Sequence, residues 1–220
     1  YQVLGNLHLE YNYGIDTTSL KPANYVRELS LDSALATCSY QLNGVTYTRE
    51  YFTSFSDDVM IIRLTANQPG KISCTLGLDR PERYQTTVHN KELQMEGQLN
   101  NGTDGNGMRY LTRVRMKPDG GILISGDSTL RVQGANSVII YISSSTDFRA
   151  VPYKQTSLAL LNAAISQSYH TDQSAHIHAY KNLSHRAKLS LDNKTPEQPA
   201  LPHPQSIIAF TTTNLDHPSP

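Results

Sequence analysis

Carboxylate side chains occur along the whole chain, and two of them facing one glycosidic bond could hydrolyse it. That chemistry takes one Asp or Glu as the acid and another as the base or nucleophile. The candidates here stand at the ends of apolar runs, where solvated carboxylates are ordinary, and nothing in their spacing pairs any two of them. We therefore assign no catalytic residue to the set, which is Glu28, Glu50, Asp57, Asp58, Asp79, Glu82 and Asp147.

Charged residues cluster in two further places. Residues 79–83 read Asp-Arg-Pro-Glu-Arg, which we interpret as a local ion-pair turn that holds a loop together. Basic side chains occupy one face of a predicted strand, and such a stripe could recognise a polyanion. Because no aromatic residues interleave with it and the formal net charge is zero, we expect a solvated or salt-bridged sheet face and no nucleic-acid partner. The stripe is Arg109, Arg113, Arg115 and Lys117.

Metal and cofactor chemistry find little support in the sequence. His176 and His178 are two residues apart on a predicted helix, so they point about 200° from each other and cannot share a metal ion. Cys38 and Cys74 alternate with polar residues on predicted core faces, which favours two buried free thiols, with a disulfide as the alternative. Phosphate-loop, dinucleotide and nucleophile-elbow motifs are absent. We expect no metal and no cofactor.

Period-two alternation of apolar and polar residues dominates the first 150 residues. The pair Asn43-Gly44 separates two such runs and predicts a tight β-hairpin, since both residues tolerate positive φ. Residues 59–64 are almost continuously apolar, as expected for a strand covered on both faces. About ten short strands bounded by turn residues predict a mainly β protein, an antiparallel β-sandwich, over residues 1–150.

The pattern changes after residue 150. Residues 156–169 and 173–184 have helical periodicity and predict two short helices, and residues 187–191 return to alternation. We expect residues 151–192 to form a helical linker and return strand that pack on the sandwich. Residues 193–220 form a proline-rich tail. No apolar run reaches the roughly 18–20 residues that a transmembrane helix needs, so we expect no membrane partner.

Several stretches, in the same order, resemble the N-terminal domain of family 95 glycoside hydrolases, the α-L-fucosidases. Residues 1–7 (YQVLGNL) are similar to that family's YQPLGDL, and residues 44–52 (GVTYTREYF) and 78–83 (LDRPER) match its sequence. Further matching segments are residues 25–32 and 107–110, Ala175, His176, Tyr180, Arg186 and residues 189–191. The resemblance covers about 190 residues.

The resemblance implies a fold and a role but no catalytic residue. In such enzymes the catalytic centre lies in an (α/α)₆ barrel downstream of the sandwich, and no position here matches it. We therefore expect a structural or interaction domain, inactive alone, whose loops shape the rim of the site. The resemblance also implies a bacterial protein that is secreted or periplasmic. The rim candidates are Arg80, Glu82, Arg83, Met108, Arg109 and Tyr110.

Two other functions stay open. A stand-alone carbohydrate-binding module would need an exposed aromatic platform, and with no Trp the 13 Tyr would have to supply it. A self-sufficient hydrolase would need two facing carboxylates in a cleft of the sandwich. The expected partners are a downstream catalytic barrel, or another chain paired with an exposed sheet edge, and a fucosylated glycan. The proline-rich tail could cover that edge instead.

Overall fold

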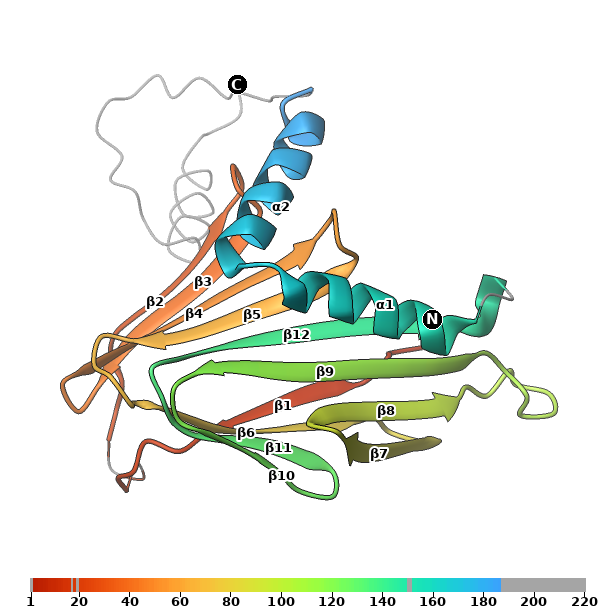
Figure 1. Cartoon of the computed structure of the whole chain (residues 1–220), viewed down its shortest axis with the longest axis horizontal. Helices are drawn as coiled ribbons and strands as arrows, with labels where there is room; N and C mark the ends of the chain where they lie inside the picture. The colour runs from red at the N-terminus through yellow and green to blue at the C-terminus, as the bar shows by residue number, and fades with distance from the viewer. Residues whose placement is uncertain (1, 17, 19, 150–151, 187–220) are drawn as a thin grey trace, which may run out of the picture. The chain divides into compact units, whose positions relative to one another are not determined.

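A computed structural model describes residues 2–16, 18, 20–149 and 152–186, which hold twelve strands, a short 3₁₀ helix and two α-helices (Figure 1). The predicted return strand at residues 187–191 and the proline-rich tail lie outside these residues. The strands are β1 (Asn6–Tyr11), β2 (Ala23–Ser30), β3 (Leu35–Leu42), β4 (Val45–Ser54), β5 (Val59–Ala66), β6 (Ile72–Asp79), β7 (Tyr84–His89), β8 (Glu92–Gln98), β9 (Arg109–Asp119), β10 (Ile122–Ser125), β11 (Thr129–Ala135) and β12 (Ser137–Thr146).

Two antiparallel sheets of unequal width form the body. The narrow sheet has four strands in the order β1-β6-β11-β10, and the wide sheet has eight in the order β2-β3-β4-β5-β12-β9-β8-β7. The main core lies between them and includes Leu64, Leu76, Val114 and Ile140, all fully buried. The prediction of a mainly β, antiparallel sandwich is confirmed, with twelve strands in the described residues where about ten were expected.

Local sequence signals account for individual strands. Leu42 pairs with Val45 across the β3–β4 turn, and Asn43 and Gly44 have φ of 49° and 74°, so the predicted hairpin is confirmed. β5 packs Ile62 and Leu64 into the main core, while Val59 and Ile61 on its other face join a second cluster beneath the helices. The continuous apolar run therefore reflects burial on both faces, as expected.

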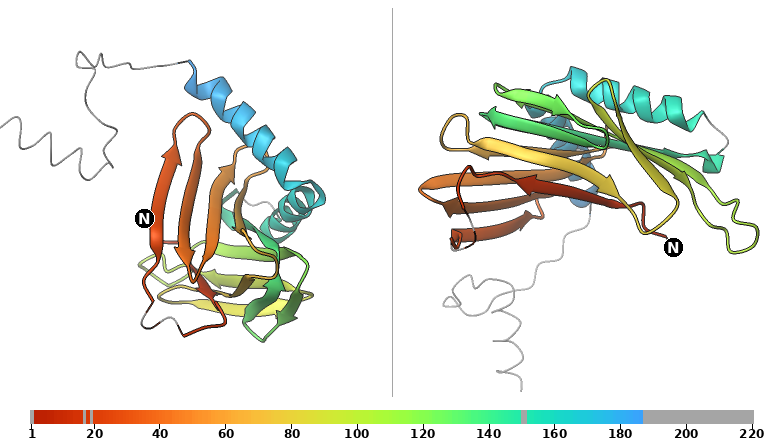
Figure 2. Two further views of the ribbon diagram at one scale, coloured as in Figure 1. Left: turned by 90° about the vertical axis from the view of Figure 1, so that its left-hand side faces the viewer. Right: turned by 90° about the horizontal axis from the view of Figure 1, so that it is seen from below.

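Two helices cover the outer face of the wide sheet (Figures 1 and 2). They are α1 (Tyr153–Ser166) and α2 (Tyr169–Ser184), so both begin earlier than predicted and Tyr169 opens the second helix instead of closing the first. Leu161 and Ala164 of α1 and Tyr169 of α2 pack on the sheet in the second cluster. Ser168 caps α2 by accepting a hydrogen bond from the backbone N–H of Thr171.

The basic stripe on β9 lies beneath α1 and is salt-bridged, as expected. Glu92 of β8 is 3% exposed and binds both Arg113 and Arg115. Arg113 also donates from Nε to the Ser157 hydroxyl of α1 (3.1 Å), and Lys117 Nζ donates to the carbonyl of Ile165 (3.1 Å) at the helix C-terminus. These three basic side chains therefore bind Glu92 of β8 and residues of α1, and they help to hold the helix on the sheet. Arg109, the fourth member of the stripe, lies at the start of β9 and is exposed.

Helix α2 reaches the turn between β2 and β3. Its Tyr180 hydroxyl donates to the Leu31 carbonyl (2.8 Å), and Lys181 pairs with Asp32 (3.0 Å). His176 is 4% exposed, its ring centre lies 4.9 Å from that of Phe52, and its Nε2 is 3.2 Å from the Ala34 carbonyl, so it is a packing residue. Among the described residues, no three His, Cys, Asp or Glu side chains are placed to hold a metal ion.

Cys38 and Cys74 are both buried and unpaired, which confirms the free-thiol interpretation over the disulfide. Burial raises the pKa of the Cys74 thiol to about 11. Within the described ranges, no helix is both long and apolar enough to cross a membrane.

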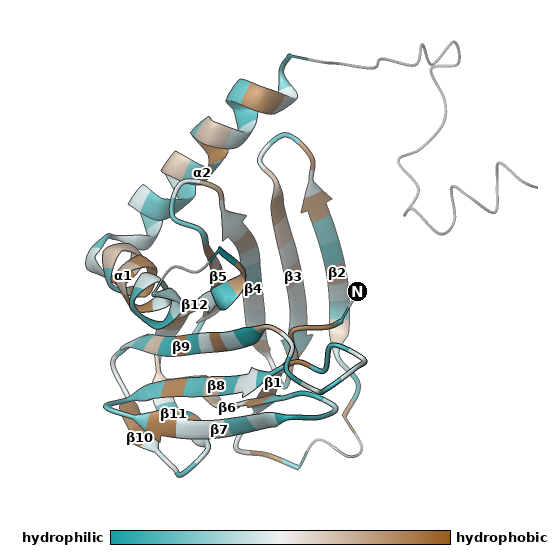
Figure 3. Cartoon of the chain, turned by 90° about the vertical axis from the view of Figure 1, so that its right-hand side faces the viewer, coloured by the Kyte–Doolittle hydropathy of each residue, from teal (hydrophilic) through white to brown (hydrophobic). Residues whose placement is uncertain are grey.

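Strand β2 forms one edge of the wide sheet, and seven of its eight residues are exposed. Its apolar members stand in solvent: Val26 is 54% exposed and Leu29 63%, and Leu31 just beyond the strand is 74% exposed. Figure 3 shows this strand at the margin of the sheet, beyond β3. The expected exposed sheet edge is therefore present.

Candidate functional site

All six predicted rim residues lie at one end of the sandwich, which we call the arginine end. It consists of the turn at residues 80–83 after β6, the loop at residues 100–108, and the first residues of β9. Arg80 and Arg83 come from the turn, whereas Arg109 and Tyr110 open β9. Glu82 is exposed and makes no hydrogen bond or ion pair with the described residues, and Met108 serves the loop through its backbone.

Arg80 packs as a buried cation. It is 6% exposed, and its guanidinium lies 5.0 Å from the centre of the Tyr110 ring, which is itself buried. Its Nε and Nη1 atoms have no hydrogen-bond partner in the described part of the chain. The attraction between a cation and the face of an aromatic ring offsets part of the cost of burying this charge.

Arg83 fastens the turn to the neighbouring loop. Its Nη1 donates to the carbonyls of Leu99 (3.2 Å) and Gly105 (2.5 Å), and its own carbonyl accepts a hydrogen bond from the Tyr110 hydroxyl (3.2 Å). Gly97 permits this approach, because a Cβ there would lie 2.0 Å from the Arg83 carbonyl oxygen. Residues 79–83 form no internal ion pair within the described structure, so the predicted ion-pair turn is wrong: Arg83 binds carbonyls instead.

The loop at residues 100–108 is held by its own side chains. Asn101 Oδ1 accepts from the backbone N–H groups of Thr103 (3.0 Å) and Gly105 (3.1 Å). Asp104 accepts from the Asn106 N–H (2.9 Å) and from the Asn101 amide (2.7 Å), and these bonds lower its pKa to about 2. The loop is therefore an ordered turn structure.

The outer surface of the arginine end carries both charged and aromatic side chains. Met108 is half-buried and its carbonyl accepts from the Leu99 N–H (2.9 Å), while the Arg109 N–H donates to Asp147 Oδ1 (2.9 Å). Phe148, next to Asp147 in the 3₁₀ helix Asp147–Arg149, is 80% exposed. Arg109 and Phe148 are both exposed to solvent, and the bond from the Arg109 N–H to Asp147 links the segments that carry them.

An open depression of about 560 Å³ adjoins the arginine end. Arg83 and Arg109 line it together with Glu96 and with Lys154 from α1. Lys154 pairs with Glu96, which raises the pKa of the lysine. With one carboxylate already neutralised by a lysine, the depression holds no acid–base pair of the kind that glycosidases use.

The other predicted carboxylates serve structural contacts where they have partners at all. Glu50 pairs with Arg63, and Asp57 accepts from the Ser54 hydroxyl. The carboxylates of Glu28 and Asp58 make no hydrogen bond or ion pair with described residues. None of the seven is brought together with another as a facing pair in the described pockets.

One surface hollow of about 390 Å³ on the narrow sheet holds two carboxylates, Glu10 and Asp79. Glu10 pairs in register with Thr75, four residues along β6 from Asp79, so the backbones are about 13 Å apart at 3.3 Å per residue. Inverting glycosidases need about 6.5–9.5 Å between carboxyl groups. Asp79 is also hydrogen-bonded to Asn6 (2.8 Å) and His8 (2.8 Å), which lowers its pKa.

Sequence reasoning missed the residues that organise the arginine end. Gly97 stands inside β8, where an isolated glycine signals a close backbone approach, and this signal was available. Glu96, Tyr84 and Lys154 line the depression beside Arg83, but they come from separate elements with no shared motif. Only the folded sheet brings these side chains together.

A solved structure places the fold in a class. The chain superposes on a putative kojibiose phosphorylase from the human microbiome with a TM-score of 0.58 and 12% identity, over 79% of this chain and 27% of that one. At this identity the likeness concerns the fold, a β-sandwich found as one part of a larger carbohydrate-active protein.

The family follows from the sequence. Residues 1–151 match the family described as "Glycosyl hydrolase family 65, N-terminal domain", and the chain belongs to that family. It is 25% identical over 231 aligned residues to Alpha-L-fucosidase 2 of Arabidopsis thaliana and 26% identical over 212 to Probable alpha-fucosidase A of Aspergillus niger. The expected resemblance to the N-terminal domain of α-L-fucosidases is confirmed. The family description that matches carries the number 65, whereas the motifs in the sequence resemble those of family 95.

The extent of these matches is uneven. They cover 90% and 87% of this chain but only 27% and 26% of the two relatives. The chain thus spans about a quarter of the length of the curated relatives it matches.

Proposed function

We propose that this chain is the non-catalytic N-terminal domain of an α-L-fucosidase-like glycoside hydrolase and that it supports a catalytic part supplied by other residues. The observation that carries the proposal is the coverage: nearly the whole chain aligns with about a quarter of two α-fucosidases. The arrangement of carboxylates agrees, since none of those predicted forms a facing pair in the described pockets.

The edge strand β2 is the surface proposed to receive the catalytic part. Its exposed apolar residues, Val26 and Leu29, lie next to the turn where α2 binds Leu31 and Asp32. Exposed apolar side chains on an edge strand are typical of a surface that another part of the protein covers.

The arginine end is proposed as the part that lies nearest the rim of the active site. Arg109, Glu82 and Phe148 are exposed there on a frame fixed by Arg83 and by the bonded loop. The turn and the loop would hold these polar and aromatic side chains at fixed positions near the active site, and the side chains would take no part in bond cleavage.

The experiment is release of fucose from an α1,2-fucosylated oligosaccharide by the purified 220-residue chain at high protein concentration. We expect no turnover above that of a Glu28→Gln, Glu82→Gln double variant, because none of the seven predicted carboxylates faces another in the described pockets. Turnover by the chain that survives further purification and disappears in a carboxylate variant would refute the proposal.

A second measurement tests the docking surface in the longer protein that the proposal implies. Leu29→Glu should lower its melting temperature and its kcat, whereas Ile122→Glu, an equally exposed apolar position on the narrow sheet (64% exposed), should change neither. Equal effects of the two substitutions would argue against β2 as the docking edge.

A further inference from the structure

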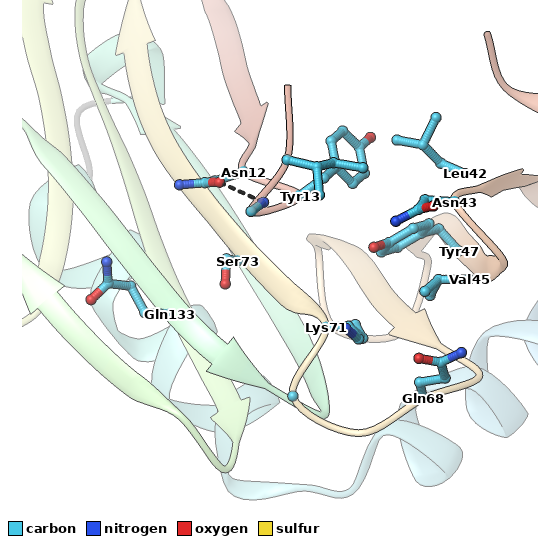
Figure 4. A pocket seen from close by; sticks show the side chains of 13 residues that line it. Asn12, Tyr13, Leu42, Asn43, Val45, Tyr47, Gln68, Lys71, Ser73 and Gln133 are labelled. Atoms are coloured by element: carbon cyan, nitrogen blue, oxygen red, sulfur yellow. Dashed lines mark hydrogen bonds between the residues drawn. The ribbon is translucent and has the colours of Figure 1, made fainter. Parts of the chain in front are cut away.

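A pocket of about 420 Å³ opens at the end of the sandwich opposite the arginine end (Figure 4). It is bounded by the segment after β1, by the β3–β4 turn and by the turn between β5 and β6. β6 runs from this pocket, at Ile72, to the arginine end at Asp79, so the full length of the strand separates the two. We call it the amide pocket. Its volume falls within the roughly 300–1,000 Å³ of small-molecule sites.

Uncharged hydrogen-bonding groups dominate the lining. Side-chain amides come from separate segments, and Ser73 adds a hydroxyl group and Lys71 the one charge (Figure 4). No Asp, Glu, His or Cys is among the residues that line it. An amide offers two donors and an acceptor, so the pocket can both give and receive hydrogen bonds without a fixed charge pattern. The four amides are those of Asn12, Asn43, Gln68 and Gln133.

Several of the polar side chains that line the pocket make no hydrogen bond within the described chain. Asn12 Oδ1 accepts from the Gly14 N–H (2.9 Å), and Ser73 Oγ accepts from the Gly134 N–H (2.9 Å). Within the described chain, the side chains of Asn43, Gln68 and Lys71 make no hydrogen bond or ion pair. A ligand therefore meets groups whose hydrogen-bonding capacity is available.

Tyr47 directs its hydroxyl group into the pocket. Its side chain is only 3% exposed, because the ring stacks on Tyr40 at 5.5 Å and meets the edge of Tyr13 at 5.1 Å. Its hydroxyl has no hydrogen-bond partner among the described residues, and Figure 4 shows it pointing from the ring into the pocket. The Tyr13 hydroxyl, in contrast, bonds to that of Tyr40 (2.7 Å). The Tyr47 hydroxyl is therefore available to a ligand in the pocket.

We propose that the amide pocket is a saccharide-binding site for a neutral sugar unit, separate from any catalytic centre. Sugar hydroxyls both donate and accept, which matches the amides of Asn43 and Gln68 and the hydroxyl of Tyr47. The partly exposed ring of Tyr13 adds apolar surface for the C–H face of a pyranose. The absence of carboxylates from the lining disfavours cations and amines as ligands, and a single lysine provides little to hold a dianion.

This inference goes beyond the proposed function. Docking through β2 concerns support of a catalytic part, whereas the amide pocket would hold a carbohydrate chain on the enzyme. Either can fail alone: loss of sugar binding would leave the fucose-release and docking results unchanged.

The test follows the side-chain amide signals of Asn43 and Gln68 by NMR in the ¹⁵N-labelled 220-residue chain. Methyl α-L-fucoside, methyl β-D-galactoside and methyl β-D-glucuronide are titrated separately. We expect saturable shifts of these signals with at least one neutral glycoside. Tyr47→Phe, which removes only the hydroxyl, should weaken binding about fivefold, the value of one net hydrogen bond.

Two matched variants complete the experiment. Tyr84→Phe removes a hydroxyl from a tyrosine beside the arginine end and should leave binding unchanged. Asn43→Gly removes an amide but keeps the positive φ of the turn, so it should weaken binding without unfolding the hairpin. Shifts with the glucuronide alone, or no shift with any neutral glycoside at millimolar concentration, would overturn the proposal. Equal weakening by Tyr84→Phe would do the same.

Discussion

The two ends of the sandwich use polar side chains in opposite ways. At the arginine end, Arg83 and Asn101 direct their polar atoms to backbone groups of the chain itself, and Gly97 allows the segments to approach closely. At the amide pocket, Asn43 and Gln68 make no bonds with the described residues, and the Tyr47 hydroxyl lacks a partner there. At the arginine end the polar side chains therefore stabilise the local fold. At the amide pocket these polar side chains have no partner in the described chain and are available to a ligand.

The comparison separates two kinds of candidate site that look alike in sequence. Both ends are rich in Asn, Gly and polar residues, and only the hydrogen-bond partners distinguish them. It follows that substitutions at the arginine end should chiefly change stability, whereas substitutions at the amide pocket should chiefly change binding. The predictions below are arranged to break or refine that division.

The largest effect is expected from Gly97→Ala. The added Cβ would meet the Arg83 carbonyl oxygen at 2.0 Å and the Tyr110 hydroxyl at 2.6 Å, so the turn must move. Overpacking of this kind costs about 3 kcal/mol of unfolding free energy, measurable by urea denaturation. Gly77→Ala on β6 is the control, because its Cβ would have no neighbour closer than 3.9 Å. A similar loss in both variants would mean that the close approach at Gly97 is not what constrains this end.

Arg83→Met should have the next largest effect. It keeps a long side chain but removes the donors to the carbonyls of Leu99 and Gly105, which costs about 1 kcal/mol for exposed hydrogen bonds. Arg109→Met, whose side chain makes no hydrogen bond with the described residues, is the matched control and should be close to neutral. If Arg109→Met proved the more destabilising variant, the clamp assigned to Arg83 would be wrong.

Gln68→Ala at the amide pocket should change the free energy of unfolding by less than about 0.5 kcal/mol, as for an exposed side chain without partners. Thermal or urea unfolding checks this value, and the same sample titrated with a neutral glycoside reports the expected loss of affinity. A clear loss of stability would show that this amide serves the fold, and the contrast between the two ends would then weaken.

The smallest expected effect is a pH response confined to the arginine end. The folded pKa of Asp104 is lowered to about 2 by the Asn106 N–H and the Asn101 amide, so its contribution is complete above the unfolded value of 3.8. That contribution is lost as the pH falls from 3.8 through about 2. NMR titration should show the amides of Gly105 and Asn106 shifting with a midpoint near 2, while the Asn43 and Gln68 amides stay unchanged. A midpoint near 4 would contradict the hydrogen bonding of the loop.

Local patterns predicted much of the fold but little of either site. The Asn43-Gly44 hairpin and the doubly buried run in β5 follow from turn chemistry and hydrophobic pattern, which act over a few residues. The ion-pair turn at residues 79–83 failed, because Arg83 finds carbonyls of a loop about twenty residues away in sequence. The order of charges along the chain does not reveal whether Arg83 binds a neighbouring carboxylate or a distant backbone carbonyl.

The amide pocket was not predicted for a related reason. Asn12, Asn43, Gln68 and Gln133 carry no motif. They converge only because the β3–β4 hairpin turn, the β5–β6 connection, the end of β1 and strand β11 meet at one end of the sandwich. The tyrosines offered a partial signal, since a carbohydrate platform without Trp required Tyr. Which of the 13 would be available depended on ring packing that the sequence does not encode locally.

The contact between α2 and the β2–β3 turn can form only late in synthesis, after both segments have been translated. The Tyr180 hydroxyl and the Leu31 carbonyl that it binds are 149 residues apart, an interval that a ribosome takes about 7–30 s to translate. Until α2 emerges, the Phe52 face of the wide sheet and the turn beside β2 lack their cover. During that interval the nascent chain exposes an open strand edge and an apolar face together, and both are sites where chains can associate wrongly.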